Sequence, residues 1–366
     1  MSVQPNPWMP DLPSYEPGRP LEEVARELGL DDIGDLIKLA SNENALGPSP
    51  RAIAAMQESA GRMHLYPDGG GYYLTEALAD KFAVHPDQVM LGNGSNEIIE
   101  LLGHVYLAPG QEIVMSERAF VIYHLVAQLF NAKTNWVPMT GFTHDLDAMR
   151  KAITPNTRLV FVANPNNPTG TRVDNAELDD FICSMPDHVI TVIDEAYVEL
   201  MPPEEQPDVL AHVRAGRPVI VLRTFSKGYG LAGLRLGYAI GPAECVELLN
   251  QARQPFNVNY MAQVAALAAL QDDAHLETTR EMVQLGLAQL TRALDELGIE
   301  YEPSCANFIL VKVGEGRSCF QSLKERHVIV RPMDGYGLPE YIRVTVGTEA
   351  ENRRFIEAMA DVLNPA

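Results

Sequence analysis

Residues 218–235 read PVIVLRTFSKGYGLAGLR, an apolar run followed by a lysine among small and hydroxyl residues. The run Pro218–Leu222 is typical of a buried strand. A lysine just after such a strand is placed where desolvation could lower its pKa and make it nucleophilic, although a lone lysine in a loop is usually solvated. The stretch therefore predicts a strand with a candidate reactive amine, that of Lys227, near its carboxyl end.

The same stretch matches the glycine pattern of a dinucleotide-binding loop. Gly228, Gly230 and Gly233 satisfy G-x-G-x-x-G directly after a strand. In dinucleotide-binding proteins this pattern opens the first βαβ unit, and an acidic strand end follows about twenty residues later. Here the pattern lies two-thirds along the chain, and Glu244 and Glu247 fall in a helical pattern. We therefore set a dehydrogenase aside.

On either side of this stretch, short apolar runs alternate with amphipathic segments between Leu74 and Gly241. The alternation predicts an α/β fold with a mostly parallel sheet between helices. We expect strands at Gln88–Leu91, Glu112–Met115, Arg158–Ala163, Val189–Ile193, Pro218–Leu222 and Leu236–Ile240.

A second region follows, with a long helical pattern over Tyr260–Leu297. Beyond it we expect β-like runs and helices at Phe308–Val313, Arg317–Arg326, Tyr341–Val346 and Glu349–Leu363. We predict three regions. Residues 1–40 form an N-terminal arm and part of the small domain, with a helical pattern at Leu21–Leu28. Residues 41–257 form a large ligand-binding domain, and residues 258–366 form a small C-terminal α+β domain.

The charge of the chain limits its partners. Twenty-eight Lys and Arg residues against 49 Asp and Glu give a formal net charge of -21, which repels nucleic acid and anionic membranes. A bound phosphate would need a local binding site, such as a helix N-terminus or a suitably placed arginine.

The four cysteines form no C-x-x-C pair and are expected to be reduced core thiols, with no metal. No signal peptide or membrane span is recognisable, so we expect a cytoplasmic enzyme.

Two further predicted strand ends carry polar groups, and ligands of open α/β sheets sit outside such ends. In LGNGSNE, residues 91–97, Ser95 is a candidate N-cap whose following amides would form an anion site, although a capped turn with nothing bound explains the segment equally well. In ANPNNPTG, residues 163–170, the prolines and glycine require a turn under any interpretation. The turn alone does not require Asn167, whose amide could donate to a ligand.

Another strand ends in VIDEAY, residues 192–197, and places Asp194 at its end. A carboxylate there is costly unless it is hydrogen-bonded or paired with a cation. A helix N-cap would explain this carboxylate but not Tyr197. Together, the four ends offer a lysine for a Schiff base, an aspartate for a pyridinium nitrogen, a tyrosine and an asparagine for a phenolic oxygen, and a helix N-terminus with Ser226 and Arg235 for a phosphate. These are the groups that pyridoxal 5'-phosphate requires.

The sequence also resembles the fold-type I aminotransferases, and within them the histidinol-phosphate aminotransferases. The resemblance runs from LASNEN at residues 39–44 through YPDGGG at residues 66–71 and the four strand ends to IRVTVGT at residues 342–348. It implies a fold-type I architecture, pyridoxal 5'-phosphate as cofactor and a homodimer with shared active sites. It also implies transfer of the amino group of L-histidinol phosphate to 2-oxoglutarate in histidine biosynthesis.

Carried over position by position, the resemblance assigns roles to residues of this chain. Lys227 would bind the cofactor covalently and move the proton, and Asp194 would keep the ring nitrogen protonated. Tyr197 and Asn167 would bond the ring oxygen, and Phe120 would stack on the ring. The phosphate would be held by the amides of Ser95 and Asn96, by Ser226 and Arg235, and by Tyr66 of a second subunit, and Thr224 would also bind the cofactor. The substrate would be bound by Tyr15, Asn42, Asn167, Arg331 and Arg343.

Three positions depart from the family pattern: Phe120 where a tyrosine is common, Asn96 where an aspartate is common, and Ala45 where a proline is common. Stacking needs only a ring and an anion site needs only amides, so cofactor binding is expected to persist while substrate choice stays open. Because an arginine fork binds carboxylate and phosphate alike, an aromatic amino-acid aminotransferase and a phosphate-substrate decarboxylase of the same fold remain alternatives. A regulatory protein on an inactive aminotransferase fold is disfavoured, because Lys227 is present.

Overall fold

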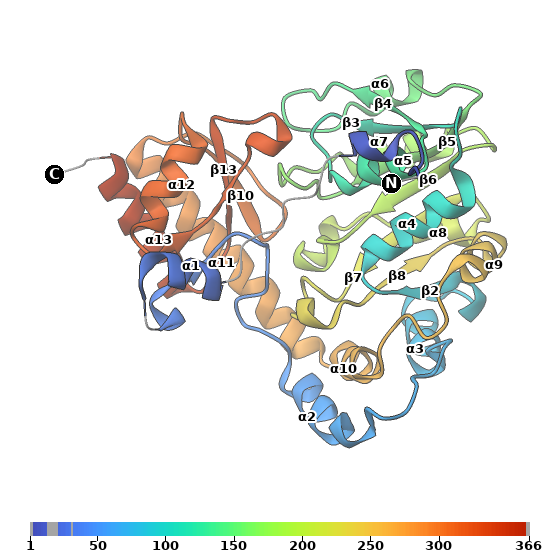
Figure 1. Ribbon diagram of the computed structural model, residues 1–366, viewed down its shortest axis with the longest axis horizontal. Coiled ribbons are helices and arrows are strands. Elements are labelled where there is room, and N and C mark those ends of the chain that lie inside the picture. The colour runs from blue at the N-terminus through green and yellow to red at the C-terminus, as the bar shows by residue number, and fades with distance from the viewer. Residues whose placement is uncertain (1–2, 13–20, 31, 364–366) are drawn as a thin grey trace.

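A seven-stranded sheet forms the centre of the larger part of the molecule in the computed structural model (Figure 1). The structure describes residues 3–12, 21–30 and 32–363. The strand order is β2-β8-β7-β6-β5-β3-β4. β8 runs antiparallel to both neighbours, and the other pairs are parallel. The strands are β2 (Val89–Gly92), β3 (Glu112–Ser116), β4 (Lys133–Val137), β5 (Thr157–Ala163), β6 (Ile190–Asp194), β7 (Val219–Thr224) and β8 (Gly237–Ile240).

All six predicted strands are present, each within two residues of its expected ends. The seventh, β4, was not predicted. It is an edge strand of sequence KTNWV in which only Val137 is buried, so no apolar run marks it.

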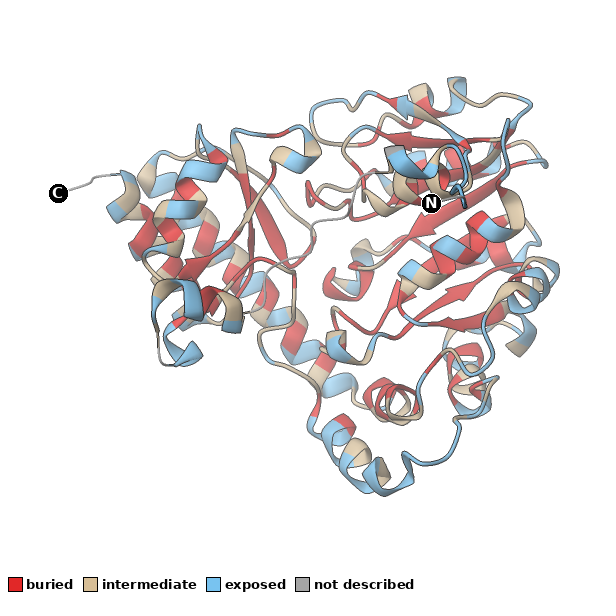
Figure 2. Cartoon of the chain, in the orientation of Figure 1, coloured by how far each residue is buried: buried red, intermediate tan, exposed pale blue. Residues whose placement is uncertain are grey.

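Alternate side chains of the central strands enter two cores on opposite faces of the sheet, and the sheet between them is buried (Figure 2). In β5, Val160 and Val162 enter one core, and Leu159 and Phe161 enter the other. The first face is covered by α2 (Pro50–Ser59), α3 (Tyr72–Phe82), α6 (Leu146–Lys151), α7 (Asn175–Cys183), α8 (Leu210–Arg214) and α10 (Tyr260–Leu270), and the second by α4 (Ser95–Tyr106), α5 (Ile122–Leu129) and α9 (Ala243–Ala252). The predicted α/β fold is confirmed.

A four-stranded antiparallel sheet of order β12-β13-β10-β9 forms a second body beside the first (Figure 1). Its strands are β9 (Tyr301–Glu302), β10 (Phe308–Lys312), β12 (Arg331–Pro332) and β13 (Tyr341–Thr345), and α11 (Asp273–Leu297), α12 (Gly316–Lys324) and α13 (Glu349–Leu363) pack with it. β1 (Ile37–Lys38) pairs in parallel with β11 (Val328–Ile329), and α1 (Leu21–Leu28) packs beside them. The 3-10 helices are η1 (Met9–Asp11), η2 (Ile33–Asp35), η3 (Ala60–Arg62), η4 (Pro86–Gln88), η5 (Val198–Leu200), η6 (Pro203–Glu205), η7 (Ala232–Leu234) and η8 (Asp334–Tyr336).

The helical pattern over Tyr260–Leu297 is two helices rather than one. Asp272 ends the continuity, because its side chain accepts a hydrogen bond from the backbone of His275 and caps α11. The long α11 bridges both bodies, since Leu276 lies in the core of the large sheet and Leu290 in the core of the small one. The domain limits drawn from the sequence stay a prediction, and α10 packs into the large core although it follows residue 258.

Two other expectations concern the cysteines and membranes. All four thiols are free, but only Cys319 is buried and Cys183 is exposed, so the expectation of four core thiols was wrong. In the described part of the chain, no helix combines the length and the apolar character needed to cross a membrane.

Candidate functional site

A cavity of about 500 Å³ lies at the carboxyl ends of β5, β6 and β7. It gathers most of the residues that the sequence singled out: Asn42, Ser95, Asn96, Phe120, Asn167, Asp194, Tyr197, Thr224, Ser226, Lys227, Arg235, Arg331 and Arg343. Side chains that are far apart in the sequence therefore share one cavity, as expected for the ends of parallel strands.

Among the described residues, one predicted site residue, Tyr66, is not part of this lining. Tyr66 is 83% exposed and stacks on Phe256, with ring centroids 4.8 Å apart. Its predicted role belongs to a second subunit and stays a prediction. Tyr15 lies outside the described residues.

The amine of Lys227 is held in the cavity by two backbone oxygens. Lys227 follows β7 in a loop that turns back through the hydrogen bond from the Phe225 amide to the Leu236 oxygen. Its Nζ donates to the oxygens of Ser41 and Asn42, each at 3.1 Å. Burial, reinforced by the positive charge of Arg343, lowers the pKa of Lys227 to about 7. A substantial fraction of this amine is therefore neutral, and hence nucleophilic, near neutral pH.

Asp194 ends β6 as a buried carboxylate. Its Oδ2 accepts a hydrogen bond from the Tyr123 hydroxyl at 2.6 Å, and its Oδ1 accepts one from the Ala196 amide at 3.2 Å. Burial raises the pKa of Asp194 to about 6, although both hydrogen bonds lower it. The carboxylate remains charged at neutral pH in a place that strongly favours a cationic neighbour.

Tyr123 is a site residue that the sequence did not reveal. It is fully buried in α5, its ring stacks on Phe161 at 4.5 Å between centroids, and it meets Phe120 edge-on at 5.7 Å. A tyrosine in an apolar helix is ordinarily a core residue, so the pattern carried no signal of the bond to Asp194.

One wall of the cavity is built to receive an anion. The N-cap of α4 is Gly94, with φ 79°, and not Ser95, which is the first residue of the helix. Glycine is favoured there because this positive φ strains any residue with a Cβ, and Nη2 of Arg235 would lie only 2.8 Å from such an atom. Arg235 donates to Oγ of Ser226 at 3.3 Å. A guanidinium, a hydroxyl and a helix N-terminus thus meet at one point.

The opposite wall comes from the small sheet and from residues 40–42. Arg343 of β13 donates to Oδ1 of Asn167 and, at 3.1 Å, to the Ala40 oxygen. Nδ2 of Asn42 donates to the Tyr197 hydroxyl at 3.0 Å. Burial raises the pKa of Tyr197 to about 12, against the opposing effect of Arg343, so its hydroxyl is a donor at neutral pH.

The segment that holds the lysine is itself anchored on the small sheet. The backbone amide of Thr345 donates to the Leu39 oxygen, and the Asn42 amide donates to Oγ1 of Thr345. Nδ2 of Asn307 donates to the same Asn42 oxygen that binds Lys227. The lysine amine, in the large body, is therefore bonded to a strip of backbone fixed to the small one.

Comparison with known proteins agrees with this arrangement. The family described as "Aminotransferase class I and II" matches residues 34–359. The histidinol-phosphate aminotransferase of Akkermansia muciniphila is 50% identical over 354 residues, 96% of this chain and 97% of that protein. The enzyme of the same name from Moorella thermoacetica is 50% identical over 351 residues, 95% of this chain and 90% of that protein.

Solved structures show the same fold. The histidinol-phosphate aminotransferase of Sinorhizobium meliloti, in complex with pyridoxal-5'-phosphate, superposes with a TM-score of 0.88 at 24% identity, covering 99% of each chain. The fold is therefore that of a fold-type I aminotransferase. With the family match and the identity to these relatives, this shows that the chain belongs to the class I and II aminotransferases.

Proposed function

We propose that this aminotransferase moves the amino group of L-histidinol phosphate to 2-oxoglutarate, giving imidazole acetol phosphate and L-glutamate, with pyridoxal 5'-phosphate bound in the cavity. The observation that carries the proposal is the meeting, in one cavity, of the Lys227 amine and the buried carboxylate of Asp194. Relatives that carry this enzyme's name and share half of the sequence over nearly the whole chain support the choice of donor.

The residues present fit the cofactor. Asp194 is a buried carboxylate whose described hydrogen bonds come from neutral donors, so a protonated ring nitrogen would supply the countercharge that burial demands. Arg235, Ser226 and the amides of Ser95 and Asn96 would hold the phosphate, Thr224 would adjoin it, and Phe120 would lie on the ring face.

When bound, pyridoxal 5'-phosphate supplies an electron sink for the charge left on the substrate α-carbon. Nζ of Lys227 would take the proton from that carbon as a base and would then deliver it, as an acid, to the cofactor carbon (C4') joined to the amino nitrogen. Asp194 would keep the ring nitrogen cationic, and the hydroxyl of Tyr197 and the amide of Asn167 would donate to the ring oxygen. Arg331 and Arg343, with Asn42 and Tyr15, bind the substrate.

A screen of amino donors tests the substrate. The holoenzyme is mixed separately with histidinol phosphate, phenylalanine, tyrosine and glutamate, and the loss of the absorbance of the bound cofactor is followed. We expect histidinol phosphate to react much faster than either aromatic amino acid. A faster reaction with phenylalanine would show that an aromatic amino acid, and not histidinol phosphate, is the preferred donor. Release of carbon dioxide in the absence of a keto acid would show that the enzyme is a decarboxylase.

Replacement of Arg343 by alanine is expected to raise the KM for histidinol phosphate by about 30-fold or more, because a charge-assisted pair contributes roughly 2–3 kcal/mol. Cofactor retention should change little, since Arg343 lies on the wall opposite Arg235. Steady-state kinetics and equilibrium dialysis of the cofactor measure the two effects. Equal losses of substrate affinity and cofactor retention would show that Arg343 is not a specific substrate-binding residue.

Replacement of Tyr123 by phenylalanine is expected to lower kcat by about 10-fold, because a hydrogen bond to a buried charged group contributes roughly 1.5–3 kcal/mol. This bond lowers the pKa of Asp194, so its loss should move the acid limb of pyridoxal 5'-phosphate binding by the cofactor-free enzyme to higher pH. Tyr106→Phe, the same change in the same core away from Asp194, serves as control. An unshifted acid limb in Tyr123→Phe would mean that this tyrosine only fills space.

We also propose a cytoplasmic homodimer with shared sites, in which the exposed Tyr66 reaches the cofactor phosphate of the other subunit. Mixing Lys227→Ala chains with Tyr66→Ala chains tests the sharing. A mixed dimer has one site in which both residues are intact, so activity should return on mixing. If each site were built from one chain, mixing would restore nothing.

A further inference from the structure

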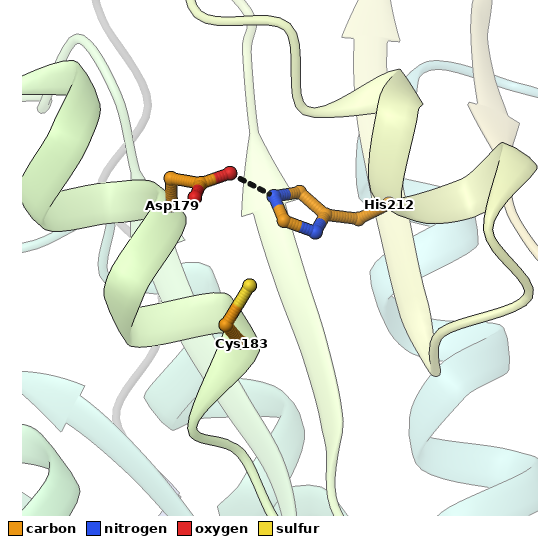
Figure 3. A group of neighbouring side chains, drawn as sticks. All are labelled: Asp179, Cys183 and His212. Atoms are coloured by element: carbon orange, nitrogen blue, oxygen red, sulfur yellow. Dashed lines mark ion pairs between the residues drawn. The ribbon is translucent and has the colours of Figure 1, made fainter.

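Away from the cavity, helices α7 and α8 bring three metal-ligating side chains together. Asp179 and Cys183 stand one turn apart on α7, and His212 lies on α8. Within the described residues, these three are the one group of His, Cys, Asp or Glu whose ligand atoms all lie within 4.8 Å of one another. In Figure 3 the carboxylate and the sulfur both approach the imidazole of His212 from the same helix.

The fold holds the two helices in place. Spacing by four residues puts Asp179 and Cys183 on one face of α7, while Phe181 on another face enters the large core. Val213 of α8 enters the same core. The imidazole of His212 is therefore presented by a fixed backbone and is only 7% exposed, whereas both residues of α7 are exposed. The fixed imidazole of His212, beside the side chains of Asp179 and Cys183 that can rotate, is a suitable arrangement for binding a small ion.

The donor set is that of zinc. Nε2 of His212 lies 2.8 Å from Oδ1 of Asp179, and the sulfur of Cys183 completes a set of one nitrogen, one oxygen and one sulfur. Zinc binds these atoms at about 2.0–2.3 Å in a tetrahedron, so the three donors should stand roughly 3.3–3.8 Å apart. The observed positions need adjustments of about 1 Å, which the exposed side chains of Asp179 and Cys183 can make by rotation.

We propose that Asp179, Cys183 and His212 form a surface site for a zinc-class divalent cation, with a fourth position open to water. The ion would link α7 to α8 across the outer face of the large sheet. None of the three residues lines the cavity that holds Lys227, so the site is separate from the transamination machinery. Because the folded arrangement binds the ion, its presence should raise the melting temperature.

The test uses tag-free holoenzyme treated with a chelator and then titrated with cobalt(II) and zinc(II). We expect one cobalt per chain, with the near-ultraviolet band of a cobalt–thiolate bond, and displacement of the cobalt by zinc. Cys183→Ser should abolish the band, and Asp179→Asn should lower the affinity by at least about tenfold, since even loss of an outer-shell partner typically costs about 10–100-fold.

Two matched controls separate these ligands from their neighbours. Cys245→Ser removes another thiol that is not fully buried, and Asp180→Asn removes the next carboxylate along α7; both should bind cobalt as the parent does. Melting temperatures without metal check the fold of each variant. A cobalt–thiolate band that survives Cys183→Ser, equal affinities of the Asp179 and Asp180 variants, or failure to bind one ion per chain would overturn the proposal.

Discussion

Replacing Lys227 by alanine is expected to remove the covalent link between chain and cofactor and to lower the transamination rate by at least about 10⁴-fold, since both the nucleophile and the proton carrier are lost. Borohydride reduction followed by mass spectrometry of the peptide around residue 227 measures the link. Single-turnover absorbance changes measure the rate.

Lys38 provides a matched control for this change. It also lies near the site and pairs with Glu43 at 2.9 Å, but it is not part of the cavity lining. Lys38→Ala should keep the reducible adduct and most of the activity. An added small primary amine should restore part of the rate to Lys227→Ala, because it can carry the same proton. A reducible adduct that persists unchanged in Lys227→Ala would reject the assignment.

Replacing Asp194 by asparagine is expected to lower kcat by roughly 10³-fold, in the range found when one preorganised electrostatic group is removed. Asparagine has nearly the same shape and can still accept a hydrogen bond from Tyr123, so the melting temperature should change little. The loss should therefore appear in turnover rather than in folding, and steady-state kinetics with thermal denaturation separates the two.

The pH dependence of Asp194 gives a second readout. Burial raises the pKa of this carboxyl to about 6, so it loses its charge as the pH falls through that value. The cofactor-free enzyme should consequently bind pyridoxal 5'-phosphate less tightly below about pH 6, and this weakening should be absent from Asp194→Asn. If cofactor binding weakened equally at low pH in the parent enzyme and in Asp194→Asn, the titrating group would be a residue other than Asp194.

The sequence was informative wherever an apolar strand ended in polar residues. Such a pattern places chemistry at a sheet edge without any knowledge of packing, and it located Asp194, Asn167 and Lys227 in one cavity. The edge strand β4 escaped notice because solvent reaches most of its side chains and no apolar run is needed. The ends of buried strands could be predicted from the sequence because burial requires a run of apolar residues. An exposed strand requires no such run.

Contacts between distant segments were not recoverable. The bond from Tyr123 to Asp194 joins residues 71 positions apart, and the cluster of Asp179 and His212 depends on how two helices lie on one sheet. The cap of α4 was placed one residue late because the Gly94 conformation, with φ 79°, is not visible in a string of small polar residues. Each miss reflects packing or backbone geometry that composition does not encode.

The backbone strip at residues 39–42 has a consequence for motion. Its backbone oxygens bind the amine of Lys227, and its other described backbone hydrogen bonds, including the one from Arg343, join it to the small body. A rotation of the small body would therefore move Arg343 and, at the same time, change the hydrogen bonds that hold the Lys227 amine. Substrate binding by Arg343 and the freedom of the Lys227 amine therefore depend on the same backbone segment, so a substitution that loosens residues 39–42 should alter both together.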